Sequence, residues 1–410
     1  MTMTVTRLPS PEWRERLQMS STGAIKSNLF NAITAVRGIR PISDRFWWDD
    51  FRHRILVSGK LPWKSDTDER SWSDYDDAKL TEYVQASDVP VTLDLVQRAV
   101  VTVSMEQRRN CIQEWLECLR WDGTPRIGKW LTYHLGVEES PYSDAVGRAW
   151  LISAVARAMQ PGCKADCVLI LEGYQGIGKS SAMRALAGAE YFTDEIGDLG
   201  SKDAALQMQG AWVVELAELD VVSRSAIERT KAFLSRSTDR YRPPYGRHVI
   251  DQPRQCVFVG TSNDVEFRDA TGNRRFWPVE VRHIDMDGIK AEREQLWAEA
   301  LTAYRAGEPW WLTDRDVIEE AKEQQANRMQ AEVWGDVLSE WLSGKDKTTV
   351  NELLRDALKV ETGRWTRADE MRISSYLKSS GWVKTRRRTH GDRSYFYLRD
   401  FRDNDRLGPR

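Results

Sequence analysis

Apolar residues in the middle of the chain form short runs that alternate with helical patterns. Three mostly apolar runs, at 168–171, 212–217 and 256–261, have the length and composition of buried strands. Before and after them, in 143–159 and 294–304, apolar residues recur at helical spacing. Buried strands that alternate with helices predict an α/β fold for this part of the chain.

The flanking regions have different patterns. Helical stretches without a chemical constellation predict a mainly helical region at 1–135. The α/β core is expected at 136–310, and helical spacing continues through 311–343 as a lid or linker. Beyond Gly344 two helices precede two strands, which predicts a separate domain at 344–410. These elements are expected at 350–358, 368–377, 382–384 and 394–398.

The N-terminal region combines helices with a group of aromatic residues. Helices are expected at 26–37, 92–104 and 109–119. Five large rings interleaved with arginine and lysine lie between the first two helices, namely Phe46, Trp47, Trp48, Phe51 and Trp63. Rings beside cations can stack nucleic-acid bases and hold phosphates. Core packing explains large aromatic residues equally well, so both interpretations stay open.

A glycine-rich loop follows the first predicted strand. Residues 173–180 read GYQGIGKS and match GxxxxGKS, the loop that cradles phosphates. Glycines permit the tight turn that aims backbone N–H groups at phosphate oxygens, and the following helix adds its positive end. The lysine is expected to meet the β and γ phosphates, and the serine hydroxyl to bind Mg²⁺. The residues concerned are Gly173, Gly176, Gly178, Lys179 and Ser180.

The alternative is a chance glycine turn before a helix. Strand, loop and helix occur in the order that phosphate binding requires. This order favours a nucleotide site.

The second predicted strand ends in two acidic residues, Glu215 and Glu218. A nucleotide hydrolase needs one carboxylate to orient the magnesium shell and another to polarise the attacking water. The acids are not adjacent, so the sequence does not divide these roles between them. A solvated strand end is the alternative, and the position downstream of the glycine loop favours the catalytic interpretation.

Polar residues also follow the third predicted strand. Asn263 can hold the attacking water or contact the γ phosphate, although asparagine is also an ordinary turn residue. Arg274 and Arg275 precede a further apolar strand. An arginine at a subunit boundary can neutralise transition-state charge in the neighbouring site, and a surface salt-bridge pair is the alternative.

A projecting turn is predicted at 239–248, where Pro-Pro and Gly interrupt the pattern. Arginine contacts with phosphate and tyrosine stacking on bases suit single-stranded nucleic acid. A plain solvated loop would explain the charges but not the aromatic residues. The candidate DNA contacts are Arg242, Tyr245, Arg247 and His248.

Charge is spread unevenly, although the formal net charge is only −2. Residues 345–410 contain 17 Lys plus Arg and 10 Asp plus Glu, a balance of +7 that leaves −9 for the rest. A basic terminal module indicates a polyanionic partner. Helices followed by a basic hairpin are typical of a winged helix on duplex DNA, with Arg386, Arg387 and Arg388 in the turn. A protein-binding winged helix and a solvated basic tail are the alternatives.

Cysteine usage and hydropathy narrow the class of protein. The five cysteines show neither paired CxxC spacing nor a nearby histidine pair, so neither a zinc site nor a disulfide framework is predicted. No apolar run approaches the length of a membrane span, and the N-terminus lacks a signal-peptide core. A cytoplasmic protein without a membrane partner is expected.

Together these motifs resemble the virulence-associated E family of P-loop ATPases, which are related to superfamily 3 helicases of phages and mobile elements. The resemblance covers about residues 105–310 and implies an AAA+-like P-loop core with a parallel sheet. It also implies ATP and Mg²⁺ as cofactors, and a homo-oligomeric ring around DNA that is expected to be a hexamer. The motifs occur in the order WDGTPRI, PGCKADC, LEGYQGIGKS, KD, WVVELAEL, KAFLS, DRYRPPYGR, FVGTSN and TGNRRFWPV.

The resemblance implies a role for each candidate residue. The implied roles are nucleotide and Mg²⁺ binding by Lys179 and Ser180, the acidic motif at Glu215 and Glu218, the sensor at Asn263, a finger acting in the neighbouring subunit at Arg274 or Arg275, and a DNA-gripping hairpin at 242–248.

Two features depart from the family pattern. The first 105 residues contain no primase-like segment, so primer synthesis would need a separate primase. The hairpin has Arg247 and His248 where superfamily 3 members present a lysine and a histidine, so the gripping residues stay open.

The sequence thus predicts an ATP-dependent helicase or translocase that replicates the DNA of a phage or mobile element and binds single-stranded and double-stranded DNA. One alternative is a nucleotide-switched origin-binding protein without processive unwinding. Another is a small-molecule P-loop kinase, against which the arginine pair, the hairpin and the basic tail argue.

Overall fold

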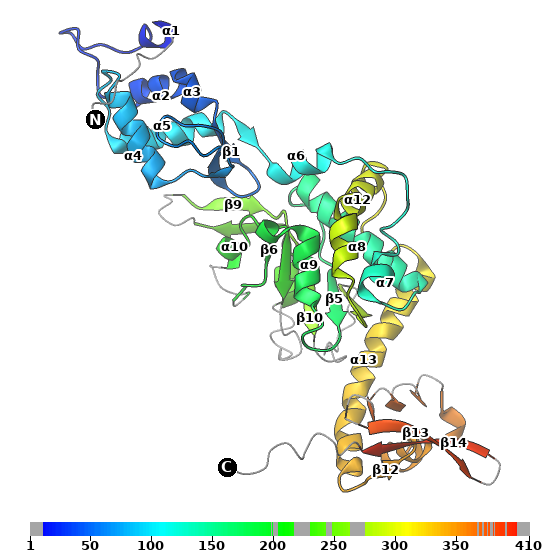
Figure 1. The fold of residues 1–410 in the computed structure, drawn as a ribbon. Helices are drawn as coiled ribbons and strands as arrows, with labels where there is room; N and C mark the ends of the chain where they lie inside the picture. The colour runs from blue at the N-terminus through cyan, green and yellow to red at the C-terminus, as the bar shows by residue number, and fades with distance from the viewer. Residues whose placement is uncertain are drawn as a thin grey trace. The chain divides into compact units, whose positions relative to one another are not determined.

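The chain divides into two compact units (Figure 1). One comprises Met1–Arg120 with Met208–Ala211, and the other comprises Trp121–Gln207 and Trp212–Arg410. The glycine loop therefore belongs to the second unit. The structure, a computed structural model, describes residues 11–197, 199, 204–216, 230–242, 248–262, 275–366, 369–370, 373–374, 376–377, 380, 382–389 and 392–399.

The first unit contains helices near the predicted ranges 26–37, 92–104 and 109–119. Asn28 caps α2 by accepting a hydrogen bond from the Asn31 amide, and Thr92 caps α5 in the same way. The apolar faces of α2, α4 and α5 contribute to one core. The helices are α1 (Pro11–Arg14), α2 (Leu29–Gly38), α3 (Arg40–Ser43), α4 (Asp74–Gln85), α5 (Leu93–Met105) and α6 (Cys111–Cys118).

This unit also contains a four-stranded sheet, so the expectation of a mainly helical region is incomplete. Aromatic and β-branched residues favour strands in β1 and β2, the two central strands, and the sheet order is β3-β2-β1-β4. Phe46 and Phe51 are 0% and 2% exposed, and Trp63 packs against the same core. Core packing is therefore the better account of the aromatic group. The strands are β1 (Phe46–Asp49), β2 (Arg54–Val57), β3 (Arg70–Ser71) and β4 (Arg108–Arg109).

The second unit contains a five-stranded parallel sheet, which confirms the predicted α/β class. The strand order is β11-β5-β10-β7-β6. Val168 lies beside Phe258 and Phe276, and Glu172 lies beside Ser262, so the carboxyl ends of these strands meet at one edge. The strands are β5 (Val168–Glu172), β6 (Phe192–Thr193), β7 (Val213–Leu216), β10 (Val257–Ser262) and β11 (Phe276–Glu280).

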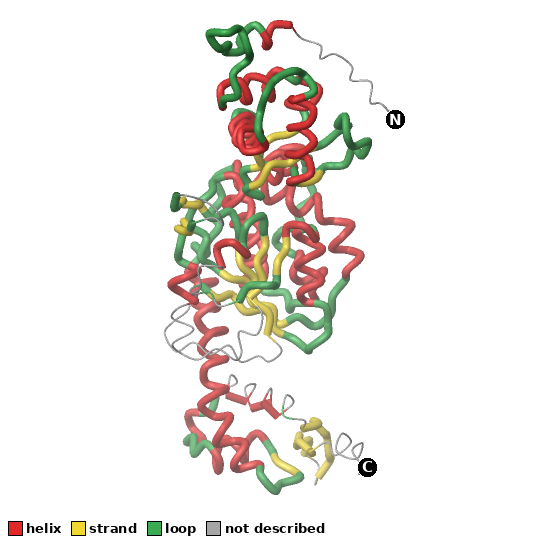
Figure 2. Tube along the Cα trace, turned by 90° about the vertical axis from the view of Figure 1, so that its left-hand side faces the viewer, coloured by secondary structure: helices red, strands yellow, loops and turns green. Residues whose placement is uncertain are grey.

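Helices pack against this sheet (Figures 1 and 2). The indoles of Trp150 and Trp212 each donate a 2.9 Å hydrogen bond to a backbone carbonyl, in β10 and α8 respectively. The ring centroids of Trp212 and Trp297 lie 4.2 Å apart. The helix predicted at 143–159 is confirmed as α8. The helices are α7 (Trp130–Leu135), α8 (Pro141–Met159), α9 (Lys179–Ala187), α10 (Ala204–Gln207) and α12 (Met286–Arg305).

A separate two-stranded hairpin lies between β7 and β10 in the sequence. It consists of β8 (Thr238–Tyr241) and β9 (Ile250–Pro253), which pair in antiparallel fashion. Of the projecting turn predicted at 239–248, residues 239–241 belong to β8, and residues 243–247 lie outside the described part of the chain.

The C-terminal part of the chain has its own apolar core. Leu338 and Leu342, near the end of α13, meet Leu353, Trp382 and Tyr397 there. α13 is a single helix that runs through most of the lid or linker predicted at 311–343. The elements are α13 (Arg315–Leu342), β12 (Lys347–Thr348), α14 (Val350–Glu352), a π-helical turn at Leu353–Ala357, β13 (Trp382–Thr389) and β14 (Asp392–Arg399).

The basic hairpin at the C-terminus differs from the prediction. Arg386, Arg387 and Arg388 lie in strand β13 and not in the turn, because pairing with β14 continues as far as Thr389 and Asp392. A third short strand, β12, pairs with β14, so the sheet order is β12-β14-β13.

Two further features concern the cysteines and the hydropathy of the helices. All five cysteines are free thiols. Among the described residues, every helix falls short of the length or the apolar character that crossing a membrane requires.

Candidate functional site

The glycine loop (residues 173–180) joins the end of β5 to the start of α9. Gly178 caps α9 with φ 100°, a left-handed conformation that other residues rarely adopt. A Cβ on Gly173 would lie 2.6 Å from the carbonyl oxygen of Val281. Glycine is therefore required at both positions, for conformation at one and for close approach at the other. Gly176 lies in the same turn.

Lys179 is the first residue of α9 and is only 6% exposed. Its Nζ donates hydrogen bonds to the carbonyl oxygens of Gly173 at 2.6 Å and Tyr174 at 3.0 Å. The loop thus holds a buried ammonium group against its own backbone.

Glu215 connects the glycine loop with two strands of the sheet. It lies in β7 and is 3% exposed. Its Oε1 accepts hydrogen bonds from Ser180 Oγ at 2.8 Å and from Thr261 Oγ1 at 2.5 Å. Its Oε2 is buried without a hydrogen-bond partner among the described residues. Two residues predicted as ligands, Ser180 and Glu215, are therefore brought into direct contact.

This arrangement has the chemistry to hold a phosphate chain together with a divalent cation. The amides at the start of α9 carry partial positive charge, and Lys179 adds a full charge. The Ser180 hydroxyl and the Glu215 carboxylate supply the oxygen ligands that Mg²⁺ prefers. A buried carboxylate oxygen without a hydrogen bond is costly, and a cation would compensate it. ATP with Mg²⁺ therefore fits the residues present.

Several predicted site residues lie outside the described part of the chain, or have undescribed side chains. The first group is Glu218, Tyr245, Arg247, Asn263 and Arg274. The second group is Arg386, Arg387 and Arg388, whose backbone alone is described. Arg242 and His248 are described at the two ends of the hairpin connection.

Arg275 lies at the opposite edge of the sheet from the glycine loop. Its carbonyl oxygen accepts a hydrogen bond from Val168, the first residue of β5, whereas the loop follows the last residue of that strand. Its Nε lies 2.9 Å from Asp166 Oδ2. Burial would raise the pKa of the Asp166 carboxyl, but the hydrogen bond from Arg275 and the charge of Lys164 hold that pKa below its usual range. The structure therefore does not bring Arg275 to the loop of its own chain.

Two contacts at the site were not anticipated from the sequence. Thr261 bonds Glu215, and the only sequence signal for it is a hydroxyl near the end of a buried strand. Val281, one residue beyond β11, places its carbonyl oxygen over Gly173. Both contacts depend on strand order, which local patterns do not encode.

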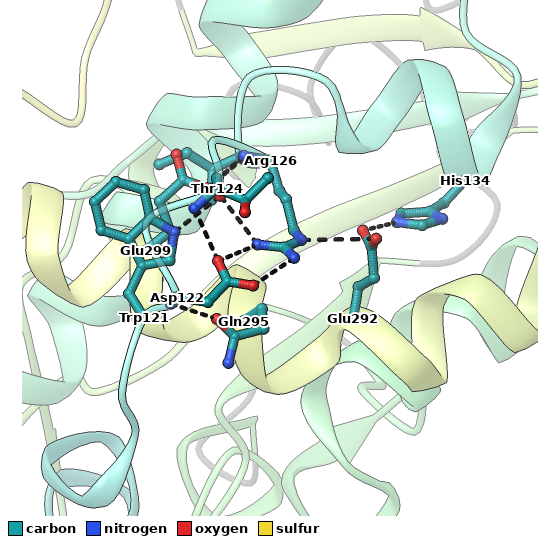
Figure 3. A network of polar contacts seen from close by, with 9 residues as sticks. Trp121, Asp122, Thr124, Arg126, His134, Glu292, Gln295 and Glu299 are labelled. Atoms are coloured by element: carbon teal, nitrogen blue, oxygen red, sulfur yellow. Dashed lines mark hydrogen bonds and ion pairs between the residues drawn. The ribbon is translucent and has the colours of Figure 1, made fainter.

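A polar network holds the WDGTPRI turn on α12 (Figure 3). Arg126 and Asp122 form a bidentate ion pair with N–O distances of 2.8 and 2.7 Å. Arg126 Nε also lies 3.6 Å from Glu292 Oε1, and the Asp122 amide donates to Gln295 Oε1 at 2.9 Å. Each of these contacts joins two residues of the network itself. We therefore interpret the network as structural.

Glu299 is the buried end of this network, 3% exposed. Its Oε2 accepts hydrogen bonds from the backbone amides of Arg126 at 2.5 Å and Ile127 at 3.0 Å (Figure 3). Its Oε1 lies 3.6 Å from Arg148 Nη1. One carboxylate thus joins the turn, α8 and α12.

Replacing Glu299 by alanine is expected to lower the free energy of unfolding by about 2–4 kcal/mol, because two buried amides lose their acceptor. Denaturant unfolding followed by tryptophan fluorescence measures the change. Glu294→Ala, an exposed position on the same helix, is the matched control. A loss below about 0.5 kcal/mol for Glu299→Ala would show that the network does not stabilise the unit.

Comparison with known proteins gives one family and a group of solved structures. The family described as virulence-associated protein E-like domain matches residues 116–330, just over half of the chain. An apo structure of the NrS-1 C-terminal region (305–718) is 14% identical, with a TM-score of 0.44, and the match covers 86% of this chain and 95% of that chain. A second, the A form apo structure of the same region, is 12% identical over 87% and 96% of the two chains, with a TM-score of 0.40. No curated protein matches this chain.

Proposed function

The chain belongs to the virulence-associated protein E-like family, and on that premise we propose that it is an ATP-dependent DNA helicase or translocase. The membership confirms the resemblance seen in the sequence. The proposed setting is DNA replication of a phage or mobile genetic element. A separate primase is proposed as a partner.

The observation that carries the proposal is the contact between Ser180 and Glu215 beside a buried lysine. In the proposed site, residues 173–180 are a phosphate loop within an AAA+-like core at 136–310. Lys179 binds the β and γ phosphates of ATP, and Ser180 with Glu215 holds Mg²⁺. ATP supplies the phosphoanhydride bond whose hydrolysis drives movement. Glu218 and Asn263 are proposed to orient the attacking water.

DNA is proposed to bind at two places. The hairpin that carries Arg242, Tyr245, Arg247 and His248 would contact single-stranded DNA. The domain at 344–410, with its three-stranded sheet in the order β12-β14-β13 after helical segments, supports a winged helix on duplex DNA. Its basic charge and the position of three arginines on β13 favour phosphate contacts.

We propose assembly as a ring, with a hexamer as the expected form, and the position of Arg275 supports it. An arginine at the edge opposite its own loop can reach a nucleotide only in a neighbouring copy. Arg274 or Arg275 is therefore proposed as the finger that completes the adjacent site.

The direct test is ATP hydrolysis by the purified protein with and without single-stranded DNA. We expect Mg²⁺-dependent turnover that rises at least about fivefold with DNA, because a motor couples the two sites. A forked duplex with one labelled strand then measures unwinding. Turnover that is slow and indifferent to DNA would contradict the motor.

The alternative is a nucleotide-switched protein that binds a replication origin without processive unwinding. The basic C-terminal domain favours it, because duplex binding alone would satisfy that surface. For this alternative we expect ATP-dependent assembly on duplex DNA. The rate of ATP hydrolysis should not change with DNA, and the strands should not be separated.

A further inference from the structure

The base of the hairpin contains a buried ion pair. Arg254 directly follows β9 and is 3% exposed, and Asp239 of β8 is 7% exposed. Arg254 Nε donates to Asp239 Oδ2 at 2.6 Å and Nη2 donates to Oδ1 at 2.7 Å. The third nitrogen, Nη1, donates to the Phe233 carbonyl oxygen at 2.6 Å. Each guanidinium nitrogen is therefore bonded, in the bidentate geometry that makes such pairs strong and directional.

Two aromatic rings and several hydrogen bonds fix the position of Arg254. The Phe233 ring lies 4.2 Å from the guanidinium carbon, and the Phe258 ring of β10 lies 5.7 Å from it. The Arg254 amide donates to the Ser237 carbonyl oxygen at 2.9 Å. Its own carbonyl oxygen accepts from Gly162 at 2.9 Å and from buried Arg157 of α8 at 3.3 Å. Both the backbone and the side chain of Arg254 thus fix the base of the hairpin to the rest of the second unit.

A short buried connection leads from this pair to the candidate nucleotide site. Only Arg254, Gln255 and Cys256 separate β9 from β10, and their exposed fractions are 3%, 8% and 3%. β10 lies between the strand that precedes the glycine loop and the strand that carries Glu215. At its far end Thr261 bonds Glu215. One strand therefore joins the hairpin base to the carboxylate proposed to hold Mg²⁺.

The charges of this pair indicate what the pair contributes at the base of the hairpin. A two-stranded hairpin alone is only marginally stable, so it needs an anchor. Apolar residues could anchor it equally well, because buried ion pairs add little net stability over a packed apolar substitute. What the pair adds is a defined geometry, since the fork of Arg254 fits Asp239 in one orientation.

We propose that Arg254 and Asp239 are positioning residues that join the hairpin rigidly to β10, so that changes at Glu215 reach the hairpin. This inference rests on the proposed function, in which the hairpin contacts DNA. The pair itself touches neither DNA nor nucleotide. Its role is to make nucleotide state and hairpin position one coupled equilibrium.

The test uses full-length variants with the pair altered. Asp239→Asn/Arg254→Met removes both charges and leaves no buried charge unpaired, so folding is retained. We expect basal ATP turnover within about twofold of wild type, and a loss of DNA stimulation of about tenfold. Arg254→Lys keeps the charge without the fork and should give an intermediate loss. Thermal melting verifies that each variant is folded.

A second readout separates this inference from the proposed function. Hydrogen exchange of the amides in β8 and β9 is measured with and without a non-hydrolysable ATP analogue and Mg²⁺. In wild type the analogue should change exchange in the hairpin, and in the neutral double variant this response should disappear. If wild-type turnover ignores DNA, the motor fails, yet the exchange response still tests the coupling.

The matched control is a pair of opposite charges on the same hairpin, one residue after Asp239 and three residues before Arg254. Arg240 and Asp251 form an exposed pair at 3.7 Å, with exposed side-chain fractions of 77% and 67%. Asp251→Asn should leave both DNA stimulation and the exchange response unchanged. Wild-type coupling in the folded double variant would overturn the inference. Equal losses in Asp251→Asn would also overturn it, because the buried pair would then have no special role.

Discussion

Alanine at both Arg274 and Arg275 is expected to lower ATP turnover by about 10³- to 10⁵-fold, the contribution of an arginine finger. The reason is geometric. Arg275 directly precedes β11 and accepts a hydrogen bond from the Val168 amide at the start of β5, whereas the glycine loop follows the other end of β5, roughly 13 Å away along the strand. The loss should therefore arise in the neighbouring copy's site, and each variant subunit should still bind ATP.

Mixing subunits tests this assignment. The arginine variant keeps an intact loop, and Lys179→Ala keeps intact arginines, so mixed rings should recover part of the turnover that each variant lacks. Lys164→Ala is the control, because Lys164 also lies near Asp166, at 3.5 Å, and is 58% exposed. Its turnover should stay within about twofold of wild type, as expected for an exposed ion pair. Two inactive variants that stay inactive after mixing, although they assemble, would contradict a shared site.

Glu215→Gln is expected to lower turnover by about 10²- to 10³-fold while ATP binding persists, because a preorganised charge at the reacting centre is lost. Glutamine can still accept the hydrogen bonds from Ser180 and Thr261. What it removes is the negative charge on the buried oxygen that has no partner among the described residues. Binding of a fluorescent ATP analogue, measured beside turnover, separates the two effects.

Glu280→Gln provides the comparison for this variant. Glu280 ends β11 at the same sheet edge, but its side chain is 58% exposed. Its loss should change turnover by less than about twofold. If Glu280→Gln lowers turnover as much as Glu215→Gln does, the loss reflects a carboxylate at this edge of the sheet and not the contacts of Glu215 with Ser180 and Thr261. Full activity in Glu215→Gln would remove this residue from the proposed magnesium site.

The sequence predicted those parts of the site that local patterns encode. GxxxxGKS specifies a strand, a loop and a helix in one short segment, and all three were found where expected. Thr261 was missed, because its contact with Glu215 requires β10 to lie beside β7, an order that depends on the whole sheet. The pair of Arg254 and Asp239 was missed for the same reason, since the register of β8 on β9 brings them together.

Two further differences between sequence and structure concern the aromatic group of the first unit and the basic hairpin. Phe46 and its aromatic neighbours were open to two interpretations, and burial against the first unit's helices favours the core. The arginines at 386–388 were assigned to a turn because charge usually marks exposed loops. Pairing between β13 and β14 instead continues through them as far as Thr389 and Asp392.

The tight connection between the hairpin and β10 also limits how related sequences can diverge. Insertions are tolerated where backbone is exposed and few contacts cross, and the buried residues 254–256 offer no such place. Length differences among relatives should therefore collect between Arg242 and His248, in the segment that connects β8 to β9. Selection could in this way alter what the hairpin grips while the connection to β10 keeps its length.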